Sequence, residues 1–350
     1  MRKIIHVDCD CFYAAIEMRD QPELAQVALA VGGRPEQRGV IATCNYLARR
    51  FGVHSAMSSR HALSLCPQLV IVPPDMARYK QASAAILRIY QDFTERIEPL
   101  SLDEAYLDVS GLPHCQGSAT RMAQAIRARI RAEVGITASA GIAANKFLAK
   151  VASDWNKPDG QWVILPHEVL DFVAALPVGK VPGIGRVTVE RMKRMGIETC
   201  ADLRQRQRHE LLRDFGSFGE RLYHLSRGED ERAVTVERIA KSISVEETYI
   251  QDLPDLPACL AALPDLLERL RARMARAGHP PFRGLSCKLK FSDFSQTTVE
   301  QRSRLLDPAC LSVLCAQGYA RRQRPVRLLG VGVRLSEETP QTTHQLTLFD

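Results

Sequence analysis

The sequence predicts a multidomain protein of the mixed α/β class (α+β in its domain organisation), and three observations lead to this prediction. The chain has 350 residues and a mass of 39.0 kDa, more than the about 100 to 200 residues of one ordinary domain. Hydrophobic residues make up 45% and charged residues 25%, which is globular usage and argues against global disorder. Short β-branched runs alternate with helical patterns through residue 165, and a second α/β region follows a helical stretch.

The first predicted element is a buried strand at residues 4–7, an apolar run that leads directly into Asp8 and Asp10. Acids at the carboxyl end of a strand lie where α/β sheets bind their ligands. We predict further strands at residues 69–72, 100–109, 136–142 and 162–165, and helices at 75–97, 118–134 and 144–153. Together these elements predict one mixed α/β domain around a single sheet.

The remaining elements predict three further regions. Residues 166–227 read as short helices, with Gly183 and Gly185 in a turn, and therefore as a small helical domain. Residues 228–240 are densely charged and aperiodic, which indicates a linker. A helix at 254–277 and strands at 284–291, 297–303 and 326–335 predict a second α/β unit, and residues 336–343 read as a flexible polar segment.

The positive charge of the chain is unevenly distributed. Fifteen basic and nine acidic residues lie between Lys241 and Leu335, so this stretch carries +6 of the chain's net charge of +7. A basic C-terminal domain suits a polyanionic partner such as nucleic acid. On charge alone, a solvated basic face explains the same pattern equally well.

Cysteine usage and hydropathy indicate a cytoplasmic protein without a membrane segment. None of the ten cysteines forms a Cys-x-x-Cys pair that could begin a zinc or redox motif. We therefore expect reduced and mostly buried thiols. The N-terminal apolar run meets Asp8 well before it reaches signal-peptide length, and no run of eighteen apolar residues occurs.

Three acids are the candidate catalytic residues. Asp8 leaves the first strand, and Asp103 and Glu104 follow about a hundred residues later. Carboxylates in twos and threes are the ligands that Mg²⁺ prefers, with coordination places left for substrate phosphates. Because neighbouring strand residues point to opposite faces, Asp103 and Glu104 can share a site only at a turn or at the start of a strand.

Two segments that contain these acids resemble the catalytic signatures of the Y-family DNA polymerases. They are DCDCFYAAIE at residues 8–17 and SLDEAYLD at residues 101–108. The resemblance continues through TCNYLARRFGV at 43–53, SAGIAANKFLAK at 139–150 and ASDWNKPDG at 152–160. It spans nearly all of the first 165 residues, and the later regions also fit the family.

The resemblance implies a right-hand polymerase fold with palm, fingers, helical thumb and C-terminal little finger. On this basis the catalytic palm comprises residues 1–10 and 74–165, and the fingers comprise 11–73. The thumb, with a helix-hairpin-helix element, comprises 166–230, followed by a linker at 231–240. The little finger, which grips DNA, comprises 241–335, and a flexible tail comprises 336–350. The implied activity is template-directed, error-prone DNA synthesis across damaged templates, without proofreading, by a monomer.

The resemblance also assigns roles in catalysis and nucleotide binding. Asp8, Asp103 and the backbone carbonyl of Cys9 match ligands of two Mg²⁺ ions, and Glu104 matches the catalytic glutamate near the primer 3′-hydroxyl. Asp10 matches an acidic family position, but we interpret it as a local hydrogen-bond partner. The family's steric gate, which excludes a ribose 2′-hydroxyl, corresponds to Tyr13, although an aromatic at such a position is otherwise ordinary core. The positions that hold the incoming deoxynucleoside triphosphate correspond to Thr43, Tyr46, Arg49 and Lys157.

Residues outside the palm match contacts to primer-template DNA and to a protein partner. The segment VPGIG at 181–185 resembles a helix-hairpin-helix hairpin, in which Gly183 and Gly185 let backbone N–H groups approach a phosphate. The tail QLTLFD resembles the peptide by which bacterial polymerases dock on the sliding clamp, with Gln345, Leu346, Leu348 and Phe349 as its contacts. A tail folded back on its own domain is the alternative. Candidate phosphate contacts in the little finger are Lys288, Lys290, Arg302, Arg304, Arg321, Arg322 and Arg324.

Two other functions remain as alternatives at this stage. A palm-type nucleotidyl cyclase would use similar acids on a similar sheet, but it needs neither the hairpin nor a basic C-terminal domain. A catalytically inactive DNA-binding or clamp-binding accessory protein would need neither the acids nor the residues assigned to the triphosphate and the sugar. Primer extension separates these three functions, because a cyclase and an accessory protein would both leave a primer unextended.

Overall fold

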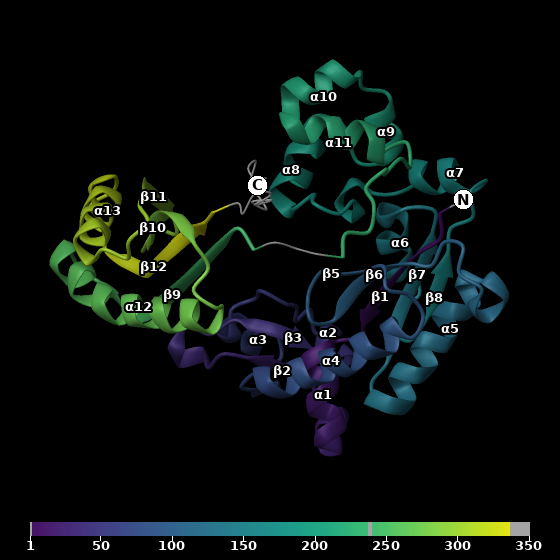
Figure 1. Ribbon diagram of the computed structural model, residues 1–350, viewed down its shortest axis with the longest axis horizontal. Coiled ribbons are helices and arrows are strands. Elements are labelled where there is room, and N and C mark those ends of the chain that lie inside the picture. Colours follow the sequence, from purple (N-terminus) through teal and green to yellow (C-terminus); the bar gives the residue numbers. More distant parts are fainter. Residues whose placement is uncertain (1, 237–239, 337–350) are drawn as a thin grey trace, which may run out of the picture. The chain divides into compact units, whose positions relative to one another are not determined.

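Figure 1 shows a computed structural model of the chain, which describes residues 2–236 and 240–336. The chain divides into two compact units, one of Met1–Pro35 and Gly39–Arg238, the other of Glu36–Arg38 and Ile239–Asp350. All ten cysteines are described and none forms a disulfide. Among the described helices, none combines the length and the apolar character needed to cross a bilayer.

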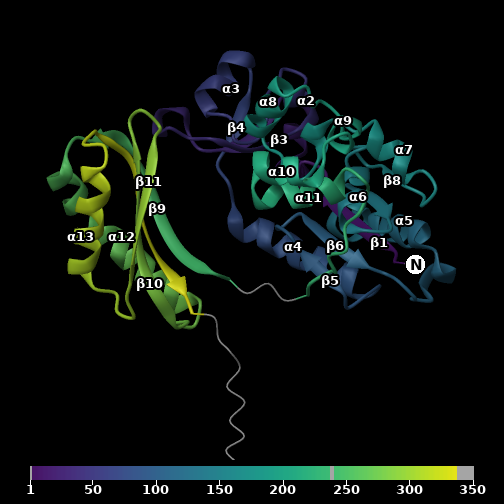
Figure 2. The same cartoon turned by 90° about the horizontal axis from the view of Figure 1, so that it is seen from above.

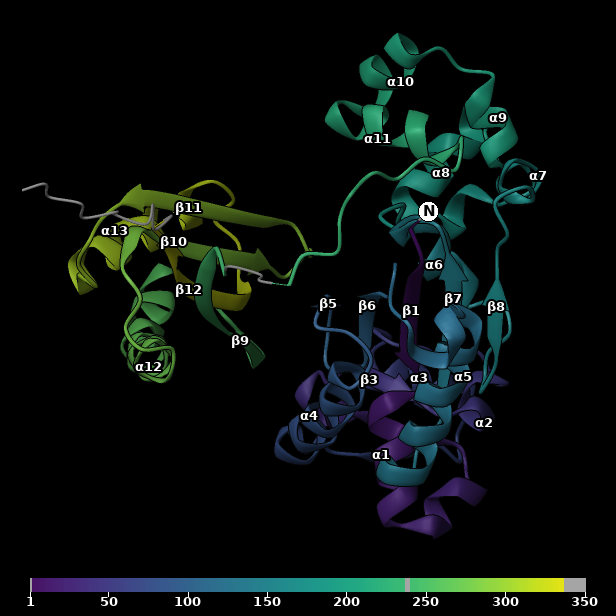
Figure 3. The ribbon, with the colours of Figure 1, turned by 45° about the vertical axis from the view of Figure 1, so that its right-hand side comes forward.

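A five-stranded sheet forms the centre of the first unit, with the strand order β5-β6-β1-β7-β8 (Figure 3). The central strand is antiparallel to both of its neighbours, and the edge strand β8 runs parallel to β7. The β-branched and apolar residues of β1 are buried on both faces, as a central strand requires. The strands are β1 (Ile4–Cys9), β5 (Ile97–Pro99), β6 (Glu104–Asp108), β7 (Ala138–Ala143) and β8 (Gln161–Val163).

Helices cover both faces of this sheet. One face packs against α1 (Phe12–Asp20), α4 (Met76–Gln91) and α5 (Ala119–Arg129), which continues into the π-helical turn η4 (Ile130–Val134). On the other face lies α6 (Lys146–Ser153), which Asn145 caps by accepting a hydrogen bond from the Leu148 N–H. Gly141 of β7 permits this close approach, because a Cβ atom there would lie 2.0 Å from the Ala149 carbonyl oxygen.

A separate three-stranded sheet has the order β3-β2-β4 and its own small core. Its strands are β2 (Leu29–Gly32), β3 (Ile41–Cys44) and β4 (Val70–Val72), and α2 (Tyr46–Arg49) and α3 (Ser59–Leu65) accompany them. The prediction of a single sheet is therefore wrong, because the predicted strand at 69–72 pairs in parallel with β2 and not with the central sheet. The run predicted a buried strand, but Val70 is exposed and Ile71 and Val72 are half-buried, because β4 lies at the edge of this smaller sheet.

Residues 166–227 form a series of short helices, as predicted. The segment comprises α7 (Val169–Ala174), α8 (Arg186–Arg194), α9 (Cys200–Arg204), α10 (Arg208–Phe215) and α11 (Ser217–Leu225). Buried residues of these helices share one core with α6 and with Ile4 and Tyr106 of the central sheet. Three further short helical turns belong to the first unit: η1 (Pro22–Gln26), η3 (His114–Gly117) and η5 (Val178–Lys180). A fourth, η2 (Pro35–Gln37), lies where the chain passes from the first unit to the second.

The second unit is a four-stranded antiparallel sheet with two helices packed on one face (Figure 2). The strand order is β11-β10-β12-β9, and Leu285, Cys287 and Leu289 of β10 point into the core under the helices. Alternate residues therefore point to the open face. The elements are β9 (Ser242–Leu253), α12 (Leu256–Arg276), β10 (Phe282–Phe291), β11 (Gln296–Arg302), α13 (Pro308–Ala320) and β12 (Val326–Leu335).

The structure corrects several element predictions. The predicted helix at 75–97 ends at Gln91. Within the predicted strand at 100–109 only residues 104–108 form a strand, β6, after a bend at 101–103, and β5 at 97–99 was not predicted. Neither β9 nor α13 was predicted. A signal for α13 is present, because Leu311, Leu314 and Gly318 have helical spacing and the Asp307 carboxylate accepts from the Ala309 N–H.

Candidate active site

The backbone brings the three predicted acids to one end of the central sheet. Asp8 and Glu104 are direct partners in the antiparallel pairing of β1 and β6, so their side chains start on the same face. Asp103 lies in the bend just before β6, and its carbonyl accepts a 2.9 Å hydrogen bond from the Cys9 N–H. Asp103 and Glu104 therefore lie at the start of a strand, the position that the sequence required if they are to share a site.

A pocket of about 330 Å³ lies at this end of the sheet. Seven of the predicted site residues line it, contributed by β1, α1, β3, α2, the bend before β6 and the loop after α6. Glu104 and Tyr46 do not line this pocket. The seven residues are Asp8, Cys9, Tyr13, Thr43, Arg49, Asp103 and Lys157.

Asp8 and Lys157 form the principal ion pair of the pocket. The Lys157 Nζ lies 2.7 Å from the Asp8 carboxylate and 3.2 Å from that of Asp154. Burial, together with the charges of Asp103 and Glu104, raises the pKa of Asp8 to about 6 against the opposing effect of Lys157. Burial alone would lower the pKa of Lys157, but the Asp8 carboxylate raises it above its ordinary value, so the lysine stays charged. One ammonium thus compensates the carboxylate only in part, as expected where a cation can bind.

The Glu104 carboxylate is turned away from the pocket, toward α6. It forms an ion pair with the Lys150 Nζ and lies 3.2 Å from the His6 Nε2. Burial would raise the pKa of Glu104, but the contacts with His6 and Lys150 lower it to about 2. His6 is fully buried, its Nδ1 lies 2.8 Å from the Ser153 hydroxyl, and burial lowers its pKa to about 4. Glu104 is therefore an ionised carboxylate whose orientation is set by α6.

The donor set fits a hard divalent cation. Asp8 and Asp103 line the same pocket and carry carboxylate oxygens, and Cys9 also lines it. In the part of the chain that the structure describes, no three His, Cys, Asp or Glu side chains cluster closely enough to hold a metal ion by themselves. An ion there would need further oxygens from its surroundings, which is how proteins commonly hold Mg²⁺ beside a phosphorylated substrate.

Asp10 holds the loop that carries Lys157, a role that sequence reasoning did not find beyond a local hydrogen-bond partner. Its carboxylate is 1% exposed and accepts 2.8 Å hydrogen bonds from the Thr137 hydroxyl, the Ser139 hydroxyl and the Asp159 N–H. The Tyr46 hydroxyl approaches the same carboxylate at 3.5 Å. Asp10 thus connects β7 with the segment two residues beyond Lys157.

The residues predicted to hold a triphosphate lie on both sides of the pocket. Thr43 is on β3, and Arg49, at the end of α2, donates from its Nε to the Cys44 carbonyl at 3.2 Å. The Arg49 guanidinium lies over the Tyr46 ring, 4.8 Å from its centroid. Tyr46 therefore supports Arg49 rather than lining the pocket itself.

Tyr13, the predicted sugar gate, is half-buried on α1 and lines the pocket. Its ring stacks on the ring of Tyr79 from α4, with centroids 4.2 Å apart and an interplanar angle of 13°. Tyr79 is fully buried. Tyr79 comes from a helix that the sequence predicted, but its contact with Tyr13 could not be read from residue spacing.

The two glycines of the predicted hairpin differ in what their positions require. Gly183 has a φ of +98°, and a Cβ atom there would lie 3.5 Å from the Phe218 ring. Gly185 is the N-cap of α8 with a φ of −86°, and nothing lies within 4 Å of a Cβ atom placed on it. The backbone at Gly183 therefore favours glycine, whereas Gly185 leaves open space at a helix N-terminus.

The structure separates the candidate basic residues of the second unit into three places. Lys288 is on the open face of the sheet, 2.9 Å from Glu246, and Lys290 lies 4.9 Å from the Phe294 ring centroid. Arg302 and Arg304 line a common pocket beside β11. Near the β10–β11 turn lie Arg321, Arg322 and Arg324, of which Arg321 bonds to Thr297 and Arg324 to Asp293. The predicted clamp contacts Gln345, Leu346, Leu348 and Phe349 lie outside the described residues.

Comparisons with known proteins agree across the chain. Residues 7–154 match the impB/mucB/samB family, residues 179–230 match a thumb domain described as that of DNA polymerase-iota, and residues 240–348 match the C-terminal domain of the impB/mucB/samB family. The DNA polymerase IV of Pseudomonas syringae pv. syringae is 58% identical over 99% of this chain and 98% of its own length. That of Pseudomonas putida strain GB-1 is also 58% identical, over 100% of this chain and 99% of its own.

Solved structures give the same result. A Y-family DNA polymerase chimera built from Dbh and Dpo4 segments superimposes with a TM-score of 0.86 and 27% identity, covering 95% of this chain and 98% of the chimera. An insertion ternary complex of Dbh DNA polymerase superimposes with a TM-score of 0.65 over the same shares at 27% identity. The chain therefore belongs to the DNA polymerase IV group of the Y-family DNA polymerases.

Proposed function

We propose that this DNA-directed DNA polymerase adds deoxynucleotides to a primer 3′ end at the pocket between Asp8 and Asp103, by phosphoryl transfer with two Mg²⁺ ions. The observation that supports the proposal most directly is that these two carboxylates line one pocket together with Tyr13, Arg49 and Lys157. Nucleotidyl transfer requires carboxylates that hold metal ions and positively charged side chains that bind the triphosphate. An aromatic ring in the same pocket can contact the sugar.

Asp8, Asp103 and the Cys9 carbonyl would hold the ions. When bound, the ions would lower the pKa of the attacking 3′-hydroxyl and neutralise charge on the triphosphate. Glu104, held ionised by α6 at the start of β6, would lie beside the primer end and orient its hydroxyl.

The remaining pocket residues would bind and select the nucleotide. Lys157 and Arg49 would bind the triphosphate oxygens, and the Thr43 hydroxyl would donate to them. Before substrate binds, Lys157 is the ion-pair partner of Asp8, so substrate binding would give Lys157 a phosphate partner in place of this carboxylate. The Tyr13 ring would exclude a 2′-hydroxyl by a direct clash. Tyr46 would act through Arg49, whose guanidinium it supports.

We propose primer-template DNA as the macromolecular partner, held by the helix-hairpin-helix element and by the basic residues of the second unit. The open N-terminus of α8 next to Gly185 offers free backbone N–H groups to a phosphate. Arg302 and Arg304 share one pocket, so they can contact neighbouring phosphates. If they do, replacing both by alanine should reduce the slope of log affinity against log salt by about 2, about 0.9 per lost contact. An unchanged slope would show that Arg302 and Arg304 do not contact DNA phosphates.

Three further properties complete the proposal. Error-prone synthesis across damaged templates and the lack of proofreading are expected from the family. Docking on the sliding clamp is expected through Gln345, Leu346, Leu348 and Phe349 at the end of the chain. Extension past a panel of damaged templates tests the first property. Deletion of residues 345–350, measured for clamp-stimulated synthesis against clamp-free synthesis, tests the last.

Primer extension with Mg²⁺ and deoxynucleotides tests the activity itself. The wild-type chain should extend a primed template, whereas Asp103→Ala should abolish extension and leave DNA affinity, measured by fluorescence anisotropy, nearly unchanged. Extension by Asp103→Ala would contradict the ligand assignment. No extension by the wild type would favour a cyclase or an accessory protein instead.

A further inference from the structure

A buried tyrosine connects the proposed sugar gate to a carboxylate outside the pocket. Tyr13 and Glu17 are four residues apart on α1, so their side chains lie on the same face of the helix. Tyr79 of α4 contacts both of them. Its ring stacks on Tyr13 at 4.2 Å, and its hydroxyl lies 2.5 Å from the Glu17 Oε1.

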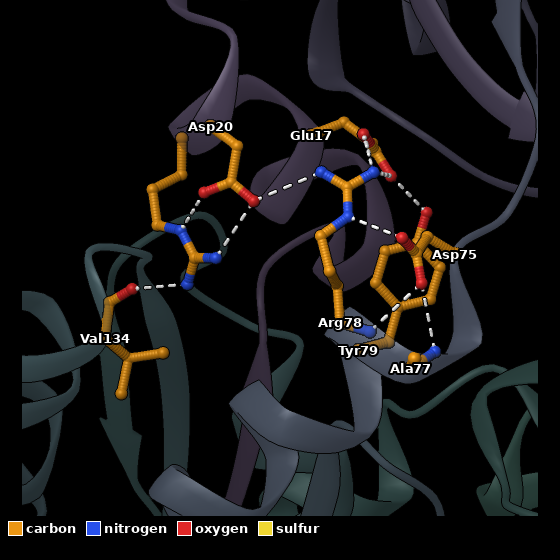
Figure 4. A network of polar contacts seen from close by, with 8 residues as sticks. Glu17, Asp20, Asp75, Ala77, Arg78, Tyr79 and Val134 are labelled. Carbon is orange, nitrogen blue, oxygen red and sulfur yellow. Dashed lines mark hydrogen bonds and ion pairs between the residues drawn. The ribbon is translucent and has the colours of Figure 1, made fainter.

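Glu17 is fixed from several sides. Its side chain is 3% exposed, and both of its oxygens accept from the Arg78 Nη2 at 3.1 and 3.0 Å (Figure 4). Arg78 also contacts Asp20 at 3.2 Å and Asp75 at 2.9 Å. Asp75 in turn caps α4 by accepting from the Ala77 and Arg78 N–H groups. The carboxylate therefore joins α1 to the first turn of α4.

The Tyr79 hydroxyl is the donor in its bond with Glu17. Burial raises the pKa of Tyr79 above its ordinary value, and the carboxylate raises it further, so the phenol stays protonated. A protonated phenol on a carboxylate forms a charge-assisted hydrogen bond, which is shorter and stronger than one between neutral groups. The ring of Tyr79 is thus held at its far end as well as by burial.

We propose that Glu17 is a positioning residue for sugar discrimination, which holds the Tyr79 ring as a fixed backing for Tyr13. The inference rests on the proposed gate role of Tyr13 and extends it to Glu17 and Tyr79, which do not line the pocket. A steric gate excludes a ribose only to the extent that the gate cannot move away from the 2′-hydroxyl. Because the two rings are stacked, movement of Tyr13 toward α4 would displace Tyr79, and the bond to the Glu17 carboxylate resists that displacement.

The test measures kcat/KM for ribonucleotide and deoxyribonucleotide insertion in four variants. Tyr79→Phe removes one oxygen and keeps the stacked ring, and Glu17→Gln removes the charge that Tyr79 and Arg78 share. Asp20→Asn is the matched control, because it removes an Arg78 partner on the same helix without touching Tyr79. Tyr13→Ala, run in parallel, tests the gate itself.

We expect Tyr79→Phe and Glu17→Gln to lower discrimination against ribonucleotides by about tenfold, the lower end of the factor for one lost hydrogen bond to a charged group. The change should come from faster ribonucleotide insertion, with deoxynucleotide insertion nearly unchanged, whereas a general structural defect would slow both. Asp20→Asn should keep the wild-type ratio, and Tyr13→Ala should admit ribonucleotides most readily.

Two results would overturn the inference in distinguishable ways. If Tyr13→Ala admits ribonucleotides while Tyr79→Phe and Glu17→Gln keep the wild-type ratio, the gate stands and its backing by Glu17 is wrong. If Tyr13→Ala leaves sugar selectivity unchanged, the gate role itself is wrong, and the inference falls with it. Because Tyr79→Phe alters a single atom, it keeps the test informative even if Glu17→Gln fails to fold.

Discussion

Replacing Asp10 by asparagine should loosen the loop that carries Lys157. In the wild type, the three 2.8 Å bonds to the Asp10 carboxylate come from Thr137, Ser139 and the Asp159 N–H. An amide has a single oxygen, and the Asp159 N–H cannot rotate away from an amide NH₂ group. The asparagine oxygen should therefore face Thr137 and Asp159, leaving its NH₂ group toward Ser139.

The size of the effect follows from these bonds. A hydrogen bond to a charged acceptor contributes about 1.5–3 kcal/mol and one to a neutral acceptor about 1 kcal/mol, so three bonds lose about 3 kcal/mol. Relief of a buried charge offsets part of this loss, and we expect a net destabilisation of about 2 kcal/mol. For a unit of this size that corresponds to a fall in Tm of about 4–8 °C.

Two measurements test the prediction for Asp10→Asn. Thermal unfolding should show the lower Tm, and steady-state insertion should show a higher KM for the deoxynucleoside triphosphate, because Lys157 is less well placed. Asp108→Asn is the matched control, since Asp108 bonds the Ser110 N–H at the far end of β6 and touches no pocket residue. An unchanged Tm together with an unchanged KM in Asp10→Asn would refute the proposed role of Asp10.

Further predictions concern the helical region. Gly183→Ala should lower Tm by several degrees, because residue 183 has a positive φ. Gly185→Ala should keep Tm but weaken DNA binding, because its methyl group would fill the open space at the N-terminus of α8. Thermal unfolding and fluorescence anisotropy measure the two properties, and equal effects of the two substitutions on Tm and on DNA affinity would contradict these different roles. Burial would raise the pKa of Asp230, but Arg232 lowers it overall, so its stabilising effect is complete above about pH 4 and is lost as the pH falls through the lowered pKa. In Asp230→Asn, Tm should therefore fall less steeply as the pH is lowered. The same dependence of Tm on pH as in the wild type would contradict the stabilising role of the Asp230 carboxylate.

Local sequence signals predicted much of the central sheet and of the pocket. The apolar run before Asp8 predicted β1, and the acid pair at 103–104 correctly required a bend before a strand. The resemblance of the motifs to a known family identified seven residues that line one pocket. The predictions of β1 and of the bend succeeded because each depends on a few neighbouring residues, whereas the roles of the seven pocket residues stay predictions.

Long-range contacts could not be predicted in the same way. Glu104 is turned toward Lys150 and His6, and Asp10 connects β7 to the Lys157 loop, through residues that are far apart in the sequence. The Glu17–Tyr79 bond crosses between two helices whose relative placement spacing alone does not fix. Strand β9 was missed because charged residues interrupt its alternation of apolar and polar side chains. Its antiparallel pairing with β12 stabilises the strand, and this contact cannot be seen in the local pattern.

The central claim is that the carboxylates of Asp8 and Asp103 hold two divalent cations beside a bound nucleotide. Electron paramagnetic resonance can count Mn²⁺ ions bound to the protein with a primer ended by a 3′-deoxynucleotide and a matching deoxynucleoside triphosphate. We predict two bound ions for the wild type and at most one for Asp103→Ala under the same conditions. Two ions bound with unchanged affinity by Asp103→Ala would contradict the assignment of the site.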